Sequence, residues 1–334
     1  MTPFLVTNSF CSGIGLQAAR FLVRINAEHR IILVCRTEES AKKALKAVLS
    51  GIPPDEASKT LLIPMSCDHT KLESVRLFAK RLPRILNETC NSNLASTGID
   101  VLCLNAAVLR PKDSPVVFTE DGVEVTFQTN ALSPFLLAFL CQHLISPNGR
   151  VVVSTSGLYT RTEFSLEGMI DPQTHQAKKG FEMIDGSTFH FKRSYALSKV
   201  CNVALTLSLQ QRLLARNISV NCFSPGLMMS SGLFRHQTEH DMATSLAHSK
   251  FIRMNEKSVA WGGGSLVYMA LSEEVGKTNG MYWSDTDSRK GDAAVYGTDF
   301  CPASISTEAI PWECTEELWR ICCQLTDVPV SILN

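Results

Sequence analysis

Short apolar runs alternate with amphipathic stretches through the first two thirds of this 334-residue chain. The apolar runs have the length and the near-continuous hydrophobicity of parallel strands that are buried on both faces. The amphipathic stretches have the spacing of helices that cross back between neighbouring parallel strands. We therefore expect strands at residues 4–7, 31–35, 61–65, 101–104, 151–155, 219–223 and 280–283, and helices at 16–25, 38–49, 72–86, 123–144, 195–215 and 258–270.

This alternation predicts an α/β fold of the doubly wound Rossmann type, with a mainly parallel seven-stranded sheet and helices on both faces. We expect a single domain over residues 1–334, with an irregular segment at 284–312 and a final helix at about 315–325 inside a C-terminal extension, 284–334. Two long segments, 157–194 and 228–256, follow the carboxyl ends of strands, where open α/β sheets bind ligands. We interpret them as the wall and the lid of a substrate pocket.

Composition excludes several kinds of partner. Lys and Arg together number 32, equal to Asp and Glu, so no overall field attracts nucleic acid. No apolar run is long enough to span a membrane, and the apolar start at residues 3–7 has no leader pattern, which favours a cytoplasmic protein, or a plastid one if a leader has been removed. The twelve cysteines are scattered, as is typical of reduced thiols. His236, Glu239 and His240 share helical spacing without a further ligand, so we expect no metal site.

The first predicted strand leads into a turn, residues 8–15, that ends in Gly13-Ile14-Gly15. A glycine turn followed by a helix N-terminus brings backbone N–H groups to a pyrophosphate. The candidate residues for this contact are Thr7, Ser12, Gly13, Ile14 and Gly15. Taken alone, two glycines at the start of a helix are also compatible with a turn that binds no nucleotide.

Arg36 follows the second predicted strand, about 20 residues after the glycine turn. An acidic residue at this position binds the ribose hydroxyls of NAD, whereas an arginine accommodates the 2′-phosphate of NADP. The alternative is a surface arginine without a ligand. The position favours the phosphate-binding role and therefore NADPH/NADP as the cofactor.

Tyr195 and Lys199 have the spacing that places two side chains on one face of a helix. A neighbouring ammonium favours tyrosinate and so lowers the pKa of the tyrosine, which makes it a usable proton donor. A tyrosine and a lysine four residues apart also occur by chance in many helices.

Together these motifs resemble the short-chain dehydrogenase/reductase superfamily. The resemblance implies that Asp68 lies beside the adenine, that Asn105 and Ala106 form the turn after the fourth strand, and that Pro225 and Gly226 form the nicotinamide-binding turn. It also implies that Tyr195 protonates the substrate, Lys199 holds the nicotinamide ribose, Ser156 orients the substrate and Asn130 anchors a water relay. Ser154 and Thr155 are alternative hydroxyls to Ser156. Members of the superfamily commonly associate through their two long helices, so both a homodimer and a monomer are open.

Several stretches resemble the light-dependent protochlorophyllide oxidoreductases more closely, among them residues 105–108, 121–130, 180–186, 195–202, 232–235 and 280–284. That family reduces a ring double bond of the pigment with NADPH after the pigment absorbs light. Leu227 stands where the family has a cysteine after Pro-Gly, and residues 130–135 depart from its Asn-His-Leu-Gly-His-Phe run. We therefore expect an NADPH-dependent reductase of a C=O or conjugated C=C group in a bulky hydrophobic molecule. A dark carbonyl or enone reductase, and a degenerate protein that binds NADP without catalysis, remain alternatives.

Overall fold

The computed structural model describes residues 3–7, 13–26, 29–54, 59, 61–89, 98–162, 186, 189–235, 256–286, 296–305 and 310–331. Their strands form one sheet in the order β3-β2-β1-β4-β5-β6-β7-β8, in which neighbours from β3 to β7 run parallel. The strands are β1 Pro3–Thr7, β2 Arg30–Cys35, β3 Leu61–Ser66, β4 Ile99–Leu104, β5 Ile145–Ser154, β6 Ser219–Phe223, β7 Met281–Thr286 and β8 Tyr296–Ser304. The strand order reverses between β1 and β4, which is the point where doubly wound sheets bind their ligands.

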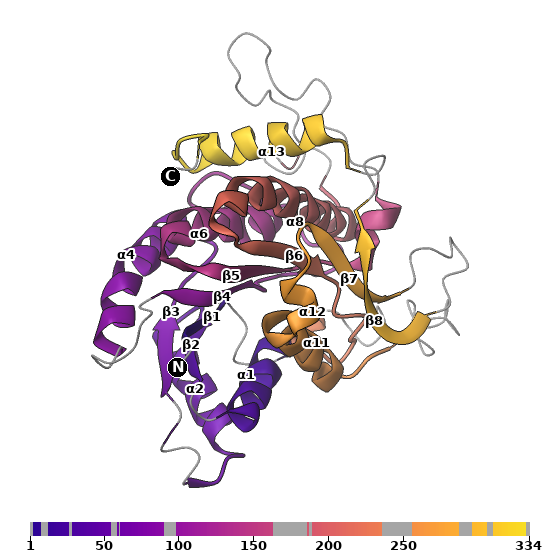
Figure 1. Cartoon of the computed structure of the whole chain (residues 1–334). Coiled ribbons are helices and arrows are strands. Elements are labelled where there is room, and N and C mark those ends of the chain that lie inside the picture. Colours follow the sequence, from indigo (N-terminus) through magenta and orange to yellow (C-terminus); the bar gives the residue numbers. More distant parts are fainter. Residues whose placement is uncertain are drawn as a thin grey trace.

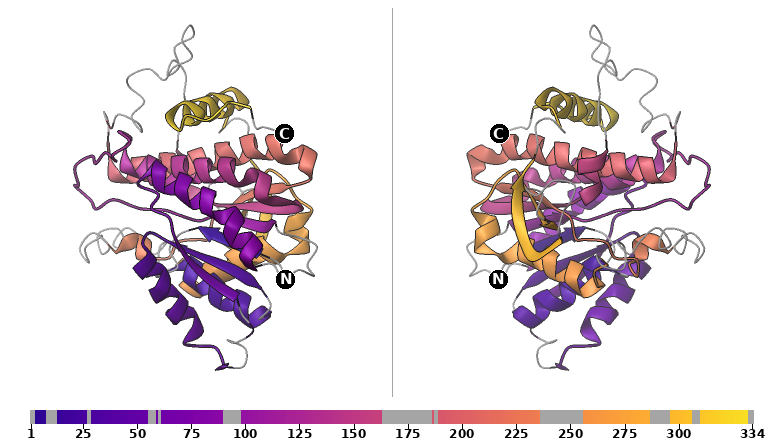
Figure 2. Two further views of the ribbon diagram at one scale, coloured as in Figure 1. Left: turned by 90° about the vertical axis from the view of Figure 1, so that its left-hand side faces the viewer. Right: turned by 90° about the vertical axis from the view of Figure 1, so that its right-hand side faces the viewer.

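Helices cover both faces of the sheet, as the alternation of strands and helices predicts (Figure 1). The longer helices are α1 Ile14–Ile25, α2 Glu38–Leu49, α4 Leu72–Thr89, α6 Ser133–Cys141, α8 Phe191–Leu213, α11 Val259–Leu271 and α13 Trp312–Leu325, and the short ones are α5 Val125–Phe127 and α12 Glu273–Gly276. Helices α1, α2 and α11 lie on one face, and α4, α6 and α8 lie on the other. Helix α13 forms a further layer outside α8 and α6 (Figure 2).

Side chains of the central strands alternate between two apolar cores. On β2, Ile31 and Leu33 pack into the core on the α1 side, whereas Ile32 and Val34 pack into the core on the α4 side. Strands buried on both faces need this near-continuous apolar sequence, which is why the parallel strands were predictable. The cores fix where the carboxyl ends of the strands come together.

The predicted seven-stranded sheet is wrong by one strand. Strand β8 lies within the segment expected to be irregular and pairs antiparallel with β7. It is an edge strand, so it tolerates Pro302 opposite Trp283 and lacks the continuous apolar run of a central strand. The aromatic ring of Phe300 stacks on that of Trp283 at 6.0 Å between centroids, which joins the strand to the core.

The single helix expected over residues 123–144 is also wrong, because the structure interrupts it twice. Helix α5 runs into a π-helical turn, η1 Gln128–Leu132, in which Ser133 N–H donates to the Gln128 carbonyl. Helix α6 then ends in a 3-10 turn, η2 Gln142–Leu144, and β5 begins at Ile145 rather than near residue 151. The π turn places Asn130 inside the fold, where its contacts with other segments replace the regular helical pattern.

The sequence raised two further questions, whether a helix spans a membrane and whether the cysteines are reduced. None of the helices in the described ranges is long and apolar enough to cross a membrane. The ten cysteines that the structure describes are free thiols, and two of them, Cys322 and Cys323, lie on the buried side of α13.

Candidate active site

Most of the predicted site residues that the structure describes follow β1, β4, β5 and β6 or lie near the starts of α1 and α8. Arg36 and Asp68 instead follow β2 and β3, and Asn130 lies in η1. Thr7, Leu104, Val153 and Cys222 are adjacent in the ladder of parallel strands, so the segments that follow them start from one edge of the sheet. Because the ends of these strands are fixed by the two cores, the residues just beyond them are held near one another.

The glycine turn retains the features of a phosphate-binding helix start. Gly13 has φ +80° and ψ −153°, a conformation that L side chains rarely adopt, and it directly precedes α1. No side chain of the described residues caps the N-terminus of α1, and the first turn of this helix carries no acidic residue. The backbone N–H groups of Ile14 and Gly15 are therefore suited to an anion. Thr7 closes β1, whereas Ser12 lies outside the described residues.

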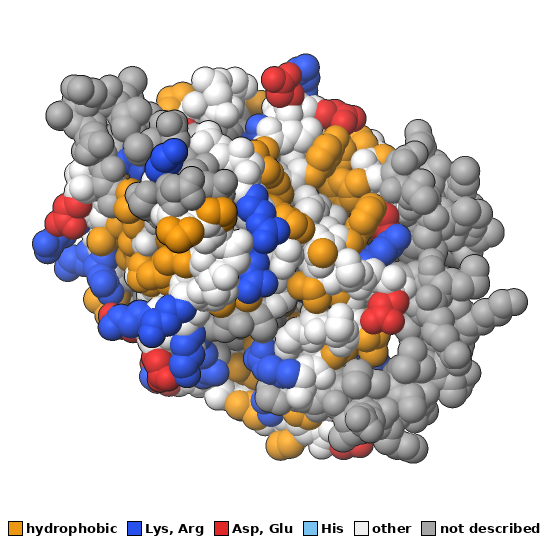
Figure 3. Space-filling model, turned by 90° about the horizontal axis from the view of Figure 1, so that it is seen from below, with side chains coloured by type: hydrophobic (Ala, Val, Ile, Leu, Met, Phe, Trp, Pro, Cys, Tyr) orange, Lys and Arg blue, Asp and Glu red, His pale blue; other side chains and the backbone are white. Residues whose placement is uncertain are grey.

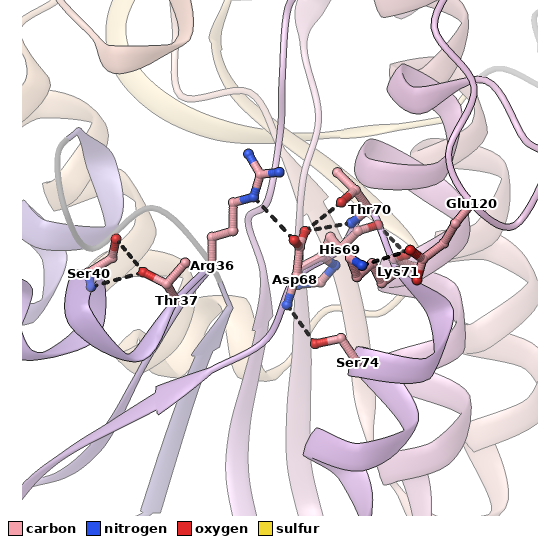
Figure 4. Close-up of polar contacts among 10 residues, drawn as sticks. Arg36, Thr37, Ser40, Asp68, His69, Thr70, Lys71, Ser74 and Glu120 are labelled. Carbon is pink, nitrogen blue, oxygen red and sulfur yellow. Dashed lines mark hydrogen bonds and ion pairs between the residues drawn. The ribbon is translucent and has the colours of Figure 1, made fainter.

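Arg36 and Asp68 meet across the ends of β2 and β3 (Figure 4). Arg36 Nε donates to Asp68 Oδ2 at 3.2 Å, and the Arg36 side chain is 66% exposed whereas that of Asp68 is 19% exposed. Partial burial raises the pKa of Asp68, but hydrogen bonds from Thr70 and the nearby guanidinium outweigh it and hold this pKa below its usual value. The carboxylate therefore stays ionised beside a cation that faces solvent.

Asn105 and Ala106 follow β4 as predicted and are both buried. Asn105 Oδ1 accepts a hydrogen bond of 2.7 Å from Ser154 Oγ at the end of β5. This contact joins the turn after β4 to the strand that leads to Ser156, so the two parts of the predicted site are connected through a buried hydroxyl.

Lys199 is almost completely buried, with 2% of its surface exposed. Its Nζ donates to the Ser154 carbonyl at 3.0 Å and lies 5.7 Å from the centroid of the Tyr195 ring. Burial lowers the pKa of Lys199 to about 7. An ammonium group in this position is thus close to losing its proton at neutral pH, and it lies on the same face of α8 as the tyrosine.

Tyr195 differs from expectation in its ionisation. Burial raises its pKa above the ordinary value, whereas the sequence predicted that a neighbouring ammonium would lower it. The physical reason is that Lys199 directs its Nζ to a backbone carbonyl and that both side chains are desolvated. The tyrosine therefore keeps its phenolic proton over the physiological pH range.

Asn130 is fully buried, and its side chain links η1 to the loop after β4 and to α8. Its Oδ1 accepts from Val108 N–H at 2.7 Å, and its Nδ2 donates to the Val108 carbonyl at 3.0 Å and to Ser198 Oγ at 3.0 Å. Ser198 Oγ in turn donates to the Tyr195 carbonyl at 2.7 Å. Asn130 therefore holds the loop after β4 against the helix that carries Tyr195.

Three hydroxyl groups compete for the role predicted for Ser156. Ser154 Oγ is engaged with Asn105, and Thr155 Oγ1 donates to the Lys199 carbonyl at 2.7 Å, so both are committed to buried contacts. Ser156 is half-buried, and its Oγ accepts from Leu158 N–H at 3.3 Å where it caps a 3-10 turn, η3 Gly157–Arg161. Among the three hydroxyls, Ser156 is thus the one nearest to solvent.

The Pro225-Gly226 turn follows β6. Gly226 has φ +86°, and a Cβ on it would lie 2.9 Å from Lys257 Cγ, so the position requires glycine. Lys257 pairs with the buried Asp285 at 3.1 Å between Nζ and Oδ2. This ion pair fixes the far side of the turn, and the sequence did not predict it because the two residues belong to different segments.

Other contributors were also missed. Asn202 Nδ2 donates to the Ser154 carbonyl at 3.2 Å, the same oxygen that Lys199 binds. Ser224 Oγ accepts from Gly157 N–H at 3.3 Å and so links the Ser156 turn to the end of β6. The one signal for Asn202 was its spacing from Lys199, which places it on the same face of α8.

Much of the predicted wall and lid lies outside the described residues. This applies to residues 163–185 and 236–255, which include His236, Glu239 and His240. In the described part of the chain, no three His, Cys, Asp or Glu residues lie together as metal ligands.

The described residues fit a phosphorylated dinucleotide. A helix start behind a glycine of positive φ, which no described side chain caps, suits a pyrophosphate, and an exposed guanidinium beside the end of β2 suits a further phosphate. The buried Lys199 ammonium and the positive-φ turn at Gly226 lie beyond the ends of β5 and β6, where the other half of such a molecule would extend.

Comparison with curated proteins finds relatives over most of the chain, although no family model matches it. Protochlorophyllide reductase A of Hordeum vulgare is 30% identical over 297 residues, covering 84% of this chain and 71% of that protein. The protochlorophyllide reductase of Avena sativa is also 30% identical, with 84% and 88% covered. The human WW domain-containing oxidoreductase is 28% identical, with 93% and 64% covered.

Solved structures share the fold. A protein of Mycobacterium paratuberculosis superposes with a TM-score of 0.67 at 20% identity, covering 99% of this chain and 95% of that one. A short-chain dehydrogenase of Burkholderia cenocepacia in complex with NADP has a TM-score of 0.60 at 20% identity, covering 84% and 95%. The doubly wound architecture is thereby confirmed.

Proposed function

The chain belongs to the short-chain dehydrogenase/reductase family, and on this premise we propose that it reduces a bulky hydrophobic small molecule with NADPH. Oxidoreductase chemistry with a nicotinamide cofactor is common to the family. The observation that carries the proposal is the pair on α8, in which the buried Lys199 ammonium lies 5.7 Å from the ring of the half-buried Tyr195 beside the end of β5. Burying a lysine without a carboxylate partner among its described contacts costs desolvation free energy, and such residues are found mainly at functional sites.

When bound, the reduced nicotinamide supplies a hydride to the substrate carbon. Tyr195 then donates its phenolic proton to the substrate atom that gains negative charge, because its raised pKa keeps that proton in place until it is needed. Lys199 stabilises the tyrosinate that results and would also hold the nicotinamide ribose. Ser156 orients the reacting group, and Asn130 keeps α8 in register with the loop after β4.

Phosphate recognition defines the choice of cofactor. Arg36 presents a solvent-exposed guanidinium at the end of β2, where a 2′-phosphate would accept two parallel hydrogen bonds from it. The helix start at Ile14 would bind the pyrophosphate, and Asp68 and Asn105 would border the adenosine half. These roles make NADPH the preferred cofactor over NADH.

The substrate is tested by a spectrum of the purified protein with NADPH and protochlorophyllide, recorded in darkness and again after illumination. A red shift after light that is absent from Tyr195→Phe would establish the photochemical reduction. An unchanged spectrum, with NADPH binding verified in the same sample, would exclude the pigment as substrate.

Leu227 favours a dark reductase as the second candidate. It stands where the protochlorophyllide reductases have a cysteine, and its carbonyl accepts from Lys257 N–H at 2.7 Å in a backbone bridge. A leucine side chain has no proton to donate, so a reaction that needs one from this position is not available here. A panel of ketones and conjugated enones in darkness tests this candidate. Binding of NADPH without turnover on either class would support the non-catalytic alternative.

We also propose that the chain is monomeric. Helix α13 lies against α8 and α6, the two helices through which subunits of the superfamily commonly associate (Figure 1). The apolar surface of that face is already covered within one chain.

A further inference from the structure

We propose that Asp68 sets the preference of this site for a 2′-phosphorylated cofactor, by holding Arg36 through Nε so that its two terminal nitrogens meet the phosphate. The inference rests on the proposed use of NADPH and assigns to Asp68 a role beyond contact with the adenine. Asp68 acts through Arg36 and is therefore a positioning residue, whereas Arg36 is the one that touches the phosphate.

Asp68 is itself held rigidly. Its Oδ1 accepts from the Thr70 backbone N–H at 3.0 Å and from Thr70 Oγ1 at 2.8 Å. The backbone N–H of Asp68 donates to Ser74 Oγ at 2.9 Å. With Oδ1 used in this way, the carboxylate presents Oδ2 to Arg36 in one fixed direction.

The Arg36 side chain is less constrained than that of Asp68, because two thirds of it is exposed to solvent. The contact with Asp68 uses Nε, and Figure 4 shows the terminal nitrogens turned away from the carboxylate. These two nitrogens form the edge that can bind a phosphate with two parallel hydrogen bonds. An arginine that is already oriented loses less rotamer freedom when the phosphate binds than one that samples solvent.

Charge and positioning predict opposite effects at Asp68. A carboxylate near a phosphate repels it, so charge alone predicts that neutralising Asp68 tightens binding of a 2′-phosphate. Positioning predicts weaker binding, because Arg36 is released. Since the site is open to solvent, which screens the repulsion, we expect positioning to dominate.

The neighbouring ion pair supplies a matched control. Lys71 Nζ binds Glu120 Oε2 at 2.7 Å in the same surface region, and both side chains are about half exposed. Replacing Glu120 with glutamine removes one negative charge, as Asp68→Asn does, without touching Arg36. Thr70→Val complements it, because it loosens Asp68 while the carboxylate keeps its charge.

The experiment is a calorimetric titration of the full chain with 2′,5′-ADP and with 5′-AMP, which differ by the 2′-phosphate alone. The ratio of the two affinities isolates that phosphate, because a changed adenine contact affects both ligands. We expect this ratio to fall about tenfold in Asp68→Asn and by a smaller factor in Thr70→Val, and to stay within about twofold in Glu120→Gln.

A ratio that is unchanged or higher in Asp68→Asn, with Thr70→Val like the wild type, would overturn the inference. Wild-type protein that binds both ligands equally would overturn it as well. Wild-type protein that binds neither ligand nor NADPH would instead contradict the proposed function. Circular dichroism of each variant verifies that it is folded. If Asp68→Asn does not fold, Thr70→Val still tests the inference.

Discussion

At the scale of single residues, burial rather than charge pairing sets the ionisation of the catalytic pair. The Lys199 ammonium contacts the Ser154 carbonyl and no carboxylate of the described residues, and burial lowers its pKa to about 7. Tyr195 responds in the opposite direction, since for a phenol the charged form is the deprotonated one. The lowered pKa of Lys199 confines the charged lysine to pH values below about 7, whereas the raised pKa of Tyr195 preserves the neutral tyrosine throughout the physiological pH range.

The pH dependence of activity should therefore report Lys199. We expect kcat/KM for reduction to fall as the pH rises through about 7, because the free enzyme then loses the ammonium that supports Tyr195. Steady-state rates from about pH 5.5 to 9 measure this, and Lys199→Met should lower the rate and remove the inflection. Lys192→Met, an exposed lysine on the same helix, is the control. An inflection that persists in Lys199→Met would assign it to another group.

His69 should make the fold sensitive to acid. It is 1% exposed, neither ring nitrogen hydrogen-bonds within the described part of the chain, and burial lowers its pKa to about 4. Because the folded-state pKa lies below the unfolded value of about 6.5, the unfolded chain binds the proton first as pH falls. The free energy of unfolding should therefore decrease by about 3 kcal/mol between about pH 6.5 and 4.

Chemical denaturation at several pH values measures that decrease. In His69→Leu the loss of unfolding free energy between these pH values should be smaller by the full contribution of His69. In His143→Leu, a change at an exposed position, the loss should equal that of the wild type. The same pH dependence in His69→Leu as in the wild type would contradict the assignment.

At the scale of elements, local sequence determined much of the fold. The bounds of α2 and β6 were predicted to the residue, since Thr37 caps α2 by accepting from Ser40 N–H and β6 is a short run with an apolar core. Strand β8 was missed because an edge strand needs no apolar pattern. The π turn was missed because contacts of Asn130 with Val108 and Ser198 stabilise it, and those residues are distant in sequence.

The candidate site shows the same division. Tyr195, Lys199 and Arg36 were identified from motifs whose spacing is local. Asn202, Ser198 and Ser224 act through contacts with other segments, and only Asn202 carried a local signal, its spacing from Lys199 on α8. The roles of all the site residues remain predictions until variants are measured.

Helix α13 should contribute strongly to stability through one residue. Trp319 is fully buried, its ring lies 4.8 Å from that of Phe135 on α6, and the Arg212 guanidinium on α8 stacks 4.0 Å above it. Arg212 also forms a bidentate ion pair with Glu316, which fixes the helix in register. Trp319→Ala should lower the free energy of unfolding by about 3–5 kcal/mol, as deletion of a buried aromatic does.

Urea denaturation compares this variant with Trp312→Ala, whose side chain is 44% exposed at the start of the same helix. The control should lose about 0.5 kcal/mol or less. Equal losses at the two positions would show that α13 is not docked through Trp319.

At the scale of the whole molecule, charge is distributed without a dominant sign. Lys and Arg balance Asp and Glu, and on the face in Figure 3 the basic side chains lie in several places with acidic ones among them towards the edges. Recognition of a charged cofactor therefore depends on local groups such as Arg36 and the start of α1 rather than on a long-range field.

The layer formed by α13 should also limit self-association. Because this helix covers α8 and α6, sedimentation equilibrium at micromolar concentration should give the mass of one chain, 36.8 kDa. A stable dimer with cross-links between α8 helices would contradict the proposed monomer.

Reduction by NADPH with Tyr195 as proton donor is tested most directly by NADPH oxidation in the wild type and in Tyr195→Phe. The assay uses protochlorophyllide in light and a ketone and enone panel in darkness. We predict turnover of one of these classes, a loss of about 10²-fold or more in Tyr195→Phe, and unchanged NADPH affinity. Full activity in Tyr195→Phe would contradict the assigned chemistry, and a wild type that binds NADPH yet turns over none of these substrates would contradict the reductase.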